Sequence, residues 1–558
     1  MTYTIEKVTT LIGARRYGDN DTSIGFILTD SRSLCFPEET LFFALKSERN
    51  DGHNYIPELY RRGVKNFVVT DVPKGYASDY PGANFLKVVN TLEALQRLAE
   101  RHRDEFNIPI VGITGSNGKT MVKEWLYQLL SPSMFVTRSP RSYNSQIGVP
   151  LSVWLMDEQT QVGVFEAGIS QPGEMLALRD IIQPTIAVLT NVGSAHQENF
   201  SSLEEKCREK LILFHDAETV VYDGDDELIT KVVAEYPDYK GEKLFWSLKN
   251  PEAPFYVKNI EKQQSVSVIT YIYKGEMDSF SIPFIDDASI QNSIISAVVA
   301  LKLGVSAEDI DKRMAKLEPV AMRLEVKVGQ HGCTLINDSY NSDINSLDIA
   351  LDFMNRRPDH RGRRHTLILS DIYQSGLSPE ALYKEVSDLA RKRGVVKFIG
   401  IGPELCQQHD AIQISEKFFF QDVEEFIKSE VFASLRDEVI LLKGARQFGF
   451  DQLTELLVQK VHETTLEVNL NAVVANLNYY RAFMKPETKL VCMIKADGYG
   501  AGAVEIAKTL QDHRVDYLAV AVADEGVTLR KNGITSNIMI MNPEMTAFKT
   551  MFDYDLEP

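Results

Sequence analysis

The chain has 558 residues, 44% of them hydrophobic and 25% charged, and its formal net charge is −18. This length exceeds what one hydrophobic core supports, so we expect three or four domains. The acidic charge argues against a nucleic-acid surface, and no stretch approaches the length of an apolar membrane span. The five cysteines lack metal-ligand spacing and the N-terminus has no apolar signal core, which predicts reduced thiols in a cytoplasmic protein.

The first part of the chain, residues 1–107, alternates short strand-like runs with helical ones. Residues 41–45 and 67–70 have the apolar character of buried strands, and residues 55–62 and 92–105 have helical spacing. This alternation predicts a first α/β domain.

A glycine-rich turn at residues 112–120 (Gly-Ile-Thr-Gly-Ser-Asn-Gly-Lys-Thr) lies between a strand-like run and a helical one. Such a turn exposes backbone N–H groups at a helix N-terminus, where phosphate oxygens bind. Lys119 would reach the β- and γ-phosphates, and the Thr120 hydroxyl would ligate Mg²⁺. Ile113 replaces the first glycine of the strict Walker spacing, so we predict a nucleoside triphosphate site with a variant loop.

The loop opens a second α/β unit, residues 108–317, in which two further strands end in polar residues. The strand-like runs 162–165 and 185–189 are followed by Glu166 and by residues 190–196, which end in His196. Each side chain alone would suit a surface or structural role. Together, at one edge of a sheet that also carries a phosphate loop, they favour a Mg²⁺ site.

A third α/β unit follows at residues 318–462. Strand-like runs at 366–369, 396–400 and 438–442 are separated by helical stretches, as a parallel sheet requires.

The last segment, residues 463–558, has regular β-α alternation. Strand-like runs at 466–468, 489–494, 517–522 and 537–540 alternate with helical runs at 471–483, 503–510 and 524–531. This pattern predicts the opening of a (β/α) barrel, which when complete takes about 250 residues. We therefore expect an incomplete barrel.

The motifs of the first three units resemble the Mur ligases of peptidoglycan synthesis. In the second unit the resemblance rests on residues 112–120, 144–150 (Asn-Ser-Gln-Ile-Gly-Val-Pro) and 190–196 and on Glu166. Upstream it rests on residues 29–32, 41–45 and 51–53, and downstream on Arg323, 338–341 (Asp-Ser-Tyr-Asn) and 443–446 (Lys-Gly-Ala-Arg). It covers about residues 20–460, in the order found in the family.

The resemblance implies an α/β protein of three domains. These are a UDP-sugar domain (1–107), a central P-loop ATPase domain (108–317) and a Rossmann-like domain (318–462), here followed by the barrel fragment. Within the family, the Asp-Ser-Tyr-Asn run and the spacing resemble the ligase that joins D-alanyl-D-alanine to UDP-MurNAc-tripeptide through an acyl phosphate. The alternatives are a sibling that adds a single amino acid, a folylpolyglutamate synthase, and a non-catalytic nucleotide-binding scaffold.

The resemblance also implies roles for particular residues. The ATP site would comprise Gly115, Ser116, Asn117, Gly118, Lys119 and Thr120, with Asn292 near the adenine, Asp338 on the ribose and Arg323 near the phosphates. Thr120, Glu166, His196 and Lys210, the last as a carbamate, would hold Mg²⁺. Lys206, one turn earlier, is the rival to Lys210. Lys119, His196 and Lys210 would be the catalytic residues.

The resemblance places the UDP-sugar end of the substrate on Asp30, Ser31 and Arg32. The alternative for these three residues is an Asp-Ser turn beside a surface arginine. The expected partners are small molecules only, with no nucleic acid and no membrane span.

The last segment has a signature of its own at residues 491–502 (Val-Cys-Met-Ile-Lys-Ala-Asp-Gly-Tyr-Gly-Ala-Gly), which resembles the lysine motif of alanine racemases. The resemblance implies that Lys495 forms a Schiff base with pyridoxal 5'-phosphate and that Tyr499 binds its phosphate. That family takes its second base and most phosphate contacts from later parts of the fold. We therefore expect the chain to be the start of a longer ligase–racemase fusion, dimeric through its racemase part, and unable to racemise alanine itself.

Overall fold

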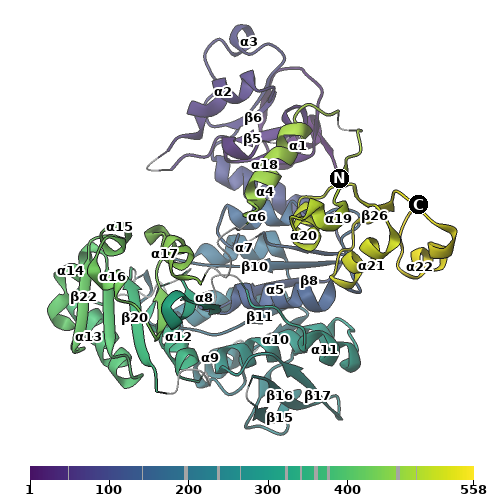
Figure 1. Ribbon diagram of the computed structural model, residues 1–558. Helices are drawn as coiled ribbons and strands as arrows, with labels where there is room; N and C mark the ends of the chain where they lie inside the picture. The colour runs from purple at the N-terminus through teal and green to yellow at the C-terminus, as the bar shows by residue number, and fades with distance from the viewer. Residues whose placement is uncertain are drawn as a thin grey trace.

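The computed structural model describes residues 1–34, 36–47, 50–140, 142–193, 199–235, 239–263, 265–320, 324–339, 342–356, 362–373, 377–459, 466–485 and 487–558. Figure 1 shows four α/β units, coloured from purple at the N-terminus through blue and green to yellow at the C-terminus. Among the described residues, no helix combines the length and the apolar composition needed to cross a bilayer.

The first unit is built on a five-stranded sheet in the order β2-β7-β6-β5-β4. Only β2 runs antiparallel to its neighbour. The predicted strands and helices form within two residues of their expected bounds. The strands are β1 (Tyr3–Thr4), β2 (Arg15–Tyr17), β3 (Ser23–Ile24), β4 (Phe26–Leu28), β5 (Thr40–Phe43), β6 (Asn66–Val69) and β7 (Asn84–Lys87), and the helices are α1 (Ile5–Ile12), α2 (Ile56–Arg61), α3 (Tyr76–Asp79) and α4 (Thr91–Arg103).

The central unit has a six-stranded, fully parallel sheet in the order β13-β12-β11-β8-β10-β9. Helices cover both faces, so β8 sends Val111 and Ile113 into one apolar core and Ile110 into the other. Burial on both faces explains why its strands read as continuous apolar runs. The strands are β8 (Ile110–Thr114), β9 (Val136–Arg138), β10 (Val162–Glu166), β11 (Ile186–Leu189), β12 (Thr219–Val221) and β13 (Glu242–Lys243). The helices are α5 (Lys119–Leu130), α6 (Gly148–Val153), α7 (Glu174–Ile182), α8 (Leu203–Leu211), α9 (Glu227–Ala234), α10 (Asp287–Lys302) and α11 (Ala307–Met314).

The central unit also carries a four-stranded sheet, in the order β14-β15-β16-β17, which the sequence patterns do not predict. Its inward residues, among them Trp246, Phe255 and Tyr271, belong to the same core as α5 and α10. Its strands are β14 (Trp246–Ser247), β15 (Phe255–Lys262), β16 (Ser267–Tyr273) and β17 (Glu276–Ile282).

The third unit is a six-stranded sheet in the order β18-β19-β23-β20-β21-β22, parallel except for β18. The three predicted strands are confirmed as β20, β21 and β23. The strands are β18 (Glu325–Val328), β19 (Thr334–Asp338), β20 (Arg364–Ser370), β21 (Lys397–Ile401), β22 (Glu416–Phe420) and β23 (Glu438–Lys443), and the helices are α12 (Ile344–Arg356), α13 (Pro379–Lys392), α14 (Pro403–Gln407), α15 (Val423–Ile427), α16 (Glu430–Ala433) and α17 (Phe450–Leu457).

The fourth unit is a three-stranded parallel sheet, β24-β25-β26, and the described residues form no closed barrel. The expected incomplete barrel is confirmed, but the strand predicted at 466–468 is wrong. Within the described part of the chain, residues 466–469 pair with no strand, and the Leu466 side chain, 73% exposed, does not pack on an apolar core. The strands are β24 (Val491–Met493), β25 (Tyr517–Val520) and β26 (Asn537–Ile540), and the helices are α18 (Leu470–Arg481), α19 (Lys495–Tyr499), α20 (Ala503–Asp512), α21 (Ala523–Lys531) and α22 (Phe548–Asp553).

The fourth unit lies beside the central unit (Figure 1). At the end of α20, the Gln511 amide donates a hydrogen bond to the Tyr127 hydroxyl of α5 over 3.2 Å. Arg514 forms an ion pair of 3.1 Å with Asp157. The yellow unit is therefore bound to the domain that carries the phosphate loop.

Candidate nucleotide site

The turn between β8 and α5 has a backbone that only glycine adopts without strain. Gly115 has φ +147° and Gly118 has φ +84°. A Cβ atom at Gly115 would lie 1.9 Å from the Thr190 hydroxyl, and one at Gly118 would lie 2.4 Å from the Asn292 side-chain oxygen. Both glycines are therefore required by close contacts as well as by conformation.

The segment after β11 holds this turn in place. The Gly193 N–H donates to Ser116 Oγ over 2.8 Å, and the Asn117 N–H donates to Asn191 Oδ1 over 2.9 Å. The Thr190 hydroxyl donates to the Asn117 carbonyl over 2.5 Å. These contacts of Thr190 and Asn191 could not be predicted from local sequence, because they join residues more than 70 positions apart.

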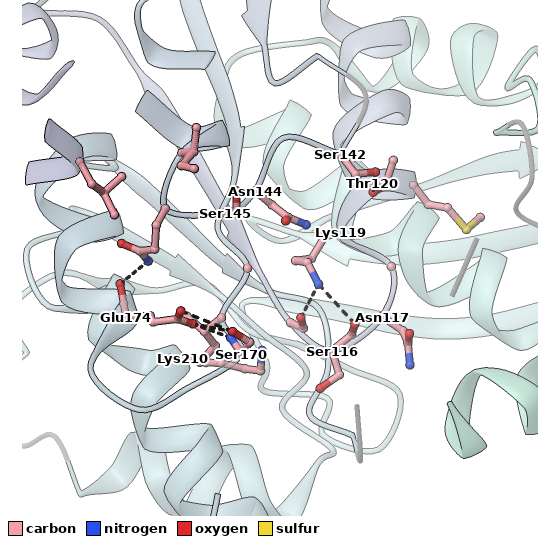
Figure 2. A pocket seen from close by; sticks show the side chains of 18 residues that line it. Ser116, Asn117, Lys119, Thr120, Ser142, Asn144, Ser145, Ser170, Glu174 and Lys210 are labelled. Atoms are coloured by element: carbon pink, nitrogen blue, oxygen red, sulfur yellow. Dashed lines mark hydrogen bonds between the residues drawn. The ribbon is translucent and has the colours of Figure 1, made fainter. Parts of the chain in front are cut away.

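Lys119 begins α5 and points back over the turn. Its Nζ donates to the Gly115 carbonyl over 2.7 Å and to the Ser116 carbonyl over 3.3 Å (Figure 2). The side chain lines a cavity of about 480 Å³. Figure 2 shows the polar residues around this cavity, among them Thr120, Ser142, Asn144, Ser170, Glu174 and Lys210.

A hydroxyl and a buried carboxylate meet beside the cavity. The Thr120 hydroxyl donates to Glu166 Oε2 over 3.1 Å, and Glu166, at the end of β10, is fully buried. Within the described part of the chain, Glu166 Oε1 accepts no hydrogen bond, although Lys123 Nζ lies 3.3 Å away.

This pair of hard oxygen atoms fits Mg²⁺, which proteins commonly bind through one or two carboxylates together with phosphate oxygens. The described residues contain no cluster of three acidic, histidine or cysteine side chains that could hold a metal. Phosphate oxygens would therefore complete the coordination. His196, predicted to help, lies outside the described residues.

Two buried lysines lie one turn apart on α8. Lys206 donates to the Gly193 carbonyl over 2.6 Å, and Lys210 is 2% exposed. Burial, with Lys119 nearby, lowers the pKa of Lys206 to about 8. Burial first, and then the charges of Lys119 and Lys206, hold the pKa of Lys210 well below its ordinary value. Lys210 lines the cavity and Lys206 is not among its lining residues, which favours Lys210 for the predicted role beside the nucleotide.

The structure brings one of the three remaining predicted ATP residues to the loop. Asn292, on α10, is buried against Gly118. Asp338 instead ends β19 in the third unit, where its carboxylate lies 2.6 Å from Lys443 Nζ with both side chains buried. Arg323 lies outside the described residues, as do Tyr340 and Asn341 of the Asp-Ser-Tyr-Asn run.

In the first unit, Asp30 begins a short 3₁₀ helix (Ser31–Ser33) and accepts a hydrogen bond from the Arg32 backbone. The Arg32 guanidinium lies 2.6 Å from the Asp30 carboxylate, and its hydrogen bond lowers the pKa of Asp30. The Arg32 side chain is 87% exposed. This is the geometry of the Asp-Ser turn with a surface arginine, and the UDP-sugar role stays a prediction.

Lys495 follows β24 and Tyr499 lies four residues further on, and both side chains are exposed. Ala496 and Asp497 between them have φ of +52°. Pyridoxal phosphate needs an enclosing wall around its ring, so these two exposed side chains do not by themselves fit the cofactor.

The geometry can be compared with known proteins. The UDP-N-acetylmuramoyl-tripeptide–D-alanyl-D-alanine ligase of Bacillus subtilis is 28% identical over 371 residues, or 65% of this chain and 77% of that protein. MurF from Acinetobacter baumannii aligns with a TM-score of 0.71 at 22% identity, over 82% of this chain and 99% of that one. MurF ligase from Thermotoga maritima in complex with ADP aligns with a TM-score of 0.65 at 23% identity, over 77% and 96%. These structures share the fold.

The parallel sheet and the loop-lined cavity define an enzyme that uses a nucleoside triphosphate. The family model of the Mur ligase middle domain matches residues 113–300, and that of the alanine racemase N-terminal domain matches residues 468–558. The chain belongs to the Mur ligase family of ATP-dependent ligases and carries an alanine-racemase-type segment after it.

Proposed function

We propose that this chain joins D-alanyl-D-alanine to the terminal carboxylate of UDP-MurNAc-tripeptide, using ATP, in peptidoglycan synthesis. The observation that carries the proposal is that Lys119, Thr120 and Lys210 line one cavity with Glu166 directly behind it. The substrates are those named for the Bacillus subtilis relative, which aligns over 371 residues.

The proposed chemistry has two steps. The tripeptide carboxylate attacks the γ-phosphorus of ATP, and ADP leaves. The amine of the dipeptide then attacks the acyl phosphate carbon, and inorganic phosphate leaves as the amide forms. Both steps gather negative charge on phosphate and carbonyl oxygens, so positive groups must converge on them.

The lysines of the cavity supply this charge. Lys119 would exchange the Gly115 and Ser116 carbonyls for the β- and γ-phosphates, which are stronger acceptors for an ammonium group. Burial first, and the positive charge of Lys119 as a smaller cause, lower the pKa of Lys206, so an anionic ligand offsets a repulsion already present between these two ammonium groups. The site therefore gains from binding polyphosphate.

Thr120 and Glu166 are the residues that would hold Mg²⁺, with His196 as a further expected ligand. When bound, Mg²⁺ neutralises charge that develops on the transferred phosphoryl group. Glu166 supplies this site with a carboxylate oxygen that accepts no hydrogen bond within the described residues.

Lys210 is the residue we propose to carry the carbamate. A free-base amine attacks CO₂, an N–C bond forms, and the nitrogen loses a proton to solvent. Burial and two neighbouring ammonium groups lower the pKa of Lys210, which favours the free base. The product is an anionic oxygen ligand in place of a cation that would repel Mg²⁺.

The test is release of phosphate from ATP with UDP-MurNAc-tripeptide, with D-alanyl-D-alanine or single amino acids as acceptor. Release that requires the dipeptide is the expected result. Release with a single amino acid would assign the chain to a sibling ligase. If the protein folds and binds ATP but no acceptor leads to phosphate release, the result would favour a non-catalytic scaffold.

A further inference from the structure

Arg138, the last residue of β9, joins the central unit to the fourth. Its Nη2 lies 3.5 Å from Asp512 at the end of α20, and its Nε donates to Glu124 Oε2 of α5 over 3.1 Å. The guanidinium also stacks on Tyr127, 3.5 Å from the ring centroid. Arg138 is thus shared between carboxylates of two domains.

The contacts continue inward from Glu124. Its carboxylate lies 2.8 Å from Lys123 Nζ, and Lys123 is fully buried. Lys123 Nζ donates to the Ser139 carbonyl over 3.0 Å and lies 3.3 Å from Glu166 Oε1. Glu166 Oε2 accepts the hydrogen bond from Thr120. One row of alternating charges therefore runs from the fourth unit to the proposed metal oxygens.

Each charged side chain in this row lies next to one of opposite charge, which favours its ionised form. Burial opposes ionisation of Glu124, but Arg138 and Lys123 outweigh it and hold the pKa of Glu124 below its usual value. Burial raises the pKa of Asp512, and Arg138 opposes that rise. A buried charge is tolerated when oppositely charged neighbours share it, so a change at one member redistributes the pairing of the next.

We propose that Asp512 of the racemase-type unit positions the metal-site carboxylate of the ligase through this row. Asp512 and Glu124 both form ion pairs with Arg138. Because Asp512 weakens the Arg138–Glu124 pair, the Glu124 carboxylate interacts more strongly with Lys123. Lys123 in turn pairs less closely with Glu166 Oε1, the oxygen that would bind Mg²⁺. Asp512 is a positioning residue, and its role as stated rests on the proposed function of Glu166.

This arrangement predicts how removal of the Asp512 charge changes the affinity for Mg²⁺. Without the Asp512 charge, Arg138 turns to Glu124, Glu124 releases Lys123, and Lys123 pairs more closely with Glu166. The affinity for Mg²⁺ then falls. Because the Arg138–Asp512 pair is partly exposed, we expect a rise of about two- to fivefold in the dissociation constant for Mg²⁺.

The experiment uses the whole chain. Asp512→Asn removes the charge, Asp512→Glu keeps it, and Lys508→Gln breaks another contact of the same helix. Lys508 Nζ lies 3.5 Å from Glu318, the same separation as Arg138 and Asp512, but it is not part of the row. Two quantities are measured: the calorimetric dissociation constant of Mg²⁺ with a non-hydrolysable ATP analogue bound, and the Mg²⁺ dependence of ligation.

The expected result is weaker Mg²⁺ binding for Asp512→Asn alone, with its kcat at saturating Mg²⁺ unchanged. Asp512→Glu should keep the wild-type dissociation constant for Mg²⁺. Equal shifts in Asp512→Asn and Lys508→Gln, or none in Asp512→Asn, would overturn the proposal. If Asp512→Asn does not fold, Glu124→Gln breaks the row from the other side and must weaken Mg²⁺ binding. A wild type that binds Mg²⁺ and nucleotide but never ligates refutes the proposed function instead.

Discussion

Two glycines in the central unit allow a matched test of the phosphate loop. Gly118 and Gly173 each precede a helix, α5 and α7, with nearly equal φ of +84° and +85°. A methyl group on either one incurs the left-handed penalty, roughly 1–2 kcal/mol. At Gly173 no atom of the described residues, its chain neighbours aside, lies within 4 Å of the added Cβ, whereas at Gly118 Asn292 Oδ1 lies 2.4 Å away.

The difference between the variants measures the contact with Asn292. An ordinary contact begins at 3.4 Å, so the amide must retreat by about 1 Å. Asn292 is 6% exposed, and forcing a buried side chain off its rotamer costs roughly 0.5–1.5 kcal/mol. We expect Gly173→Ala to lose about 1–2 kcal/mol of unfolding free energy and Gly118→Ala about 1.5–3.5 kcal/mol.

The assay is denaturant unfolding followed by tryptophan fluorescence, because Trp125, Trp154 and Trp246, the only tryptophans, all lie in the central unit. Calorimetry gives the ATP affinity, which we expect to fall about tenfold or more in Gly118→Ala and to stay near wild type in Gly173→Ala. Equal losses of stability and equal ATP affinities in the two variants would refute the reasoning.

Three further predictions concern the site and the core beside it. Lys119→Ala should lower ATP-driven phosphate release by about a hundredfold or more, and activity close to wild type would contradict its phosphate role. Lys210→Met should abolish release while Lys206→Met retains part of it; equal loss in both would speak against Lys210 as the carbamate. Burial lowers the pKa of His102 to about 4, below the 6.5 of the unfolded chain. The unfolded state therefore binds the proton first, and about 3 kcal/mol of stability is lost as pH falls from 6.5 to 4. Denaturant unfolding at several pH values, followed by tryptophan fluorescence, measures this loss, because Trp154 lies 4.6 Å from His102, and His102→Gln should abolish it; an unchanged pH dependence would exclude His102 as its origin.

The local parts of this protein could be predicted from the sequence, because their causes are local. The phosphate loop lies within nine consecutive residues, and strands buried on both faces read as apolar runs. Glu166 could be placed because it directly follows such a strand. The four-stranded mixed sheet of residues 246–282 is not predicted, since strands such as β16 and β17 alternate buried and more exposed residues and gain their burial from distant helices.

The rest of the site depends on contacts between distant positions. Lys123 was overlooked because a helical lysine is ordinarily exposed, yet its place among the buried positions of α5, near Leu126 and Leu130, is a signal that could have found it. Asp338 was expected on the ribose, and its 2.6 Å pairing with Lys443 joins residues more than 100 positions apart. No spacing rule reports such a pair.

The position of β9 has a consequence for association. This strand, Val136–Arg138, pairs only with β10 among the described residues, so it forms one edge of the central sheet and β13 forms the other. Unpaired edges are templates on which other chains add strands, and charge or a covering element prevents this. The end of α20 places Asp512 against Arg138 at that edge. We therefore expect a shortened chain that ends before α20 to lose this contact at the edge and to associate more readily than the whole chain.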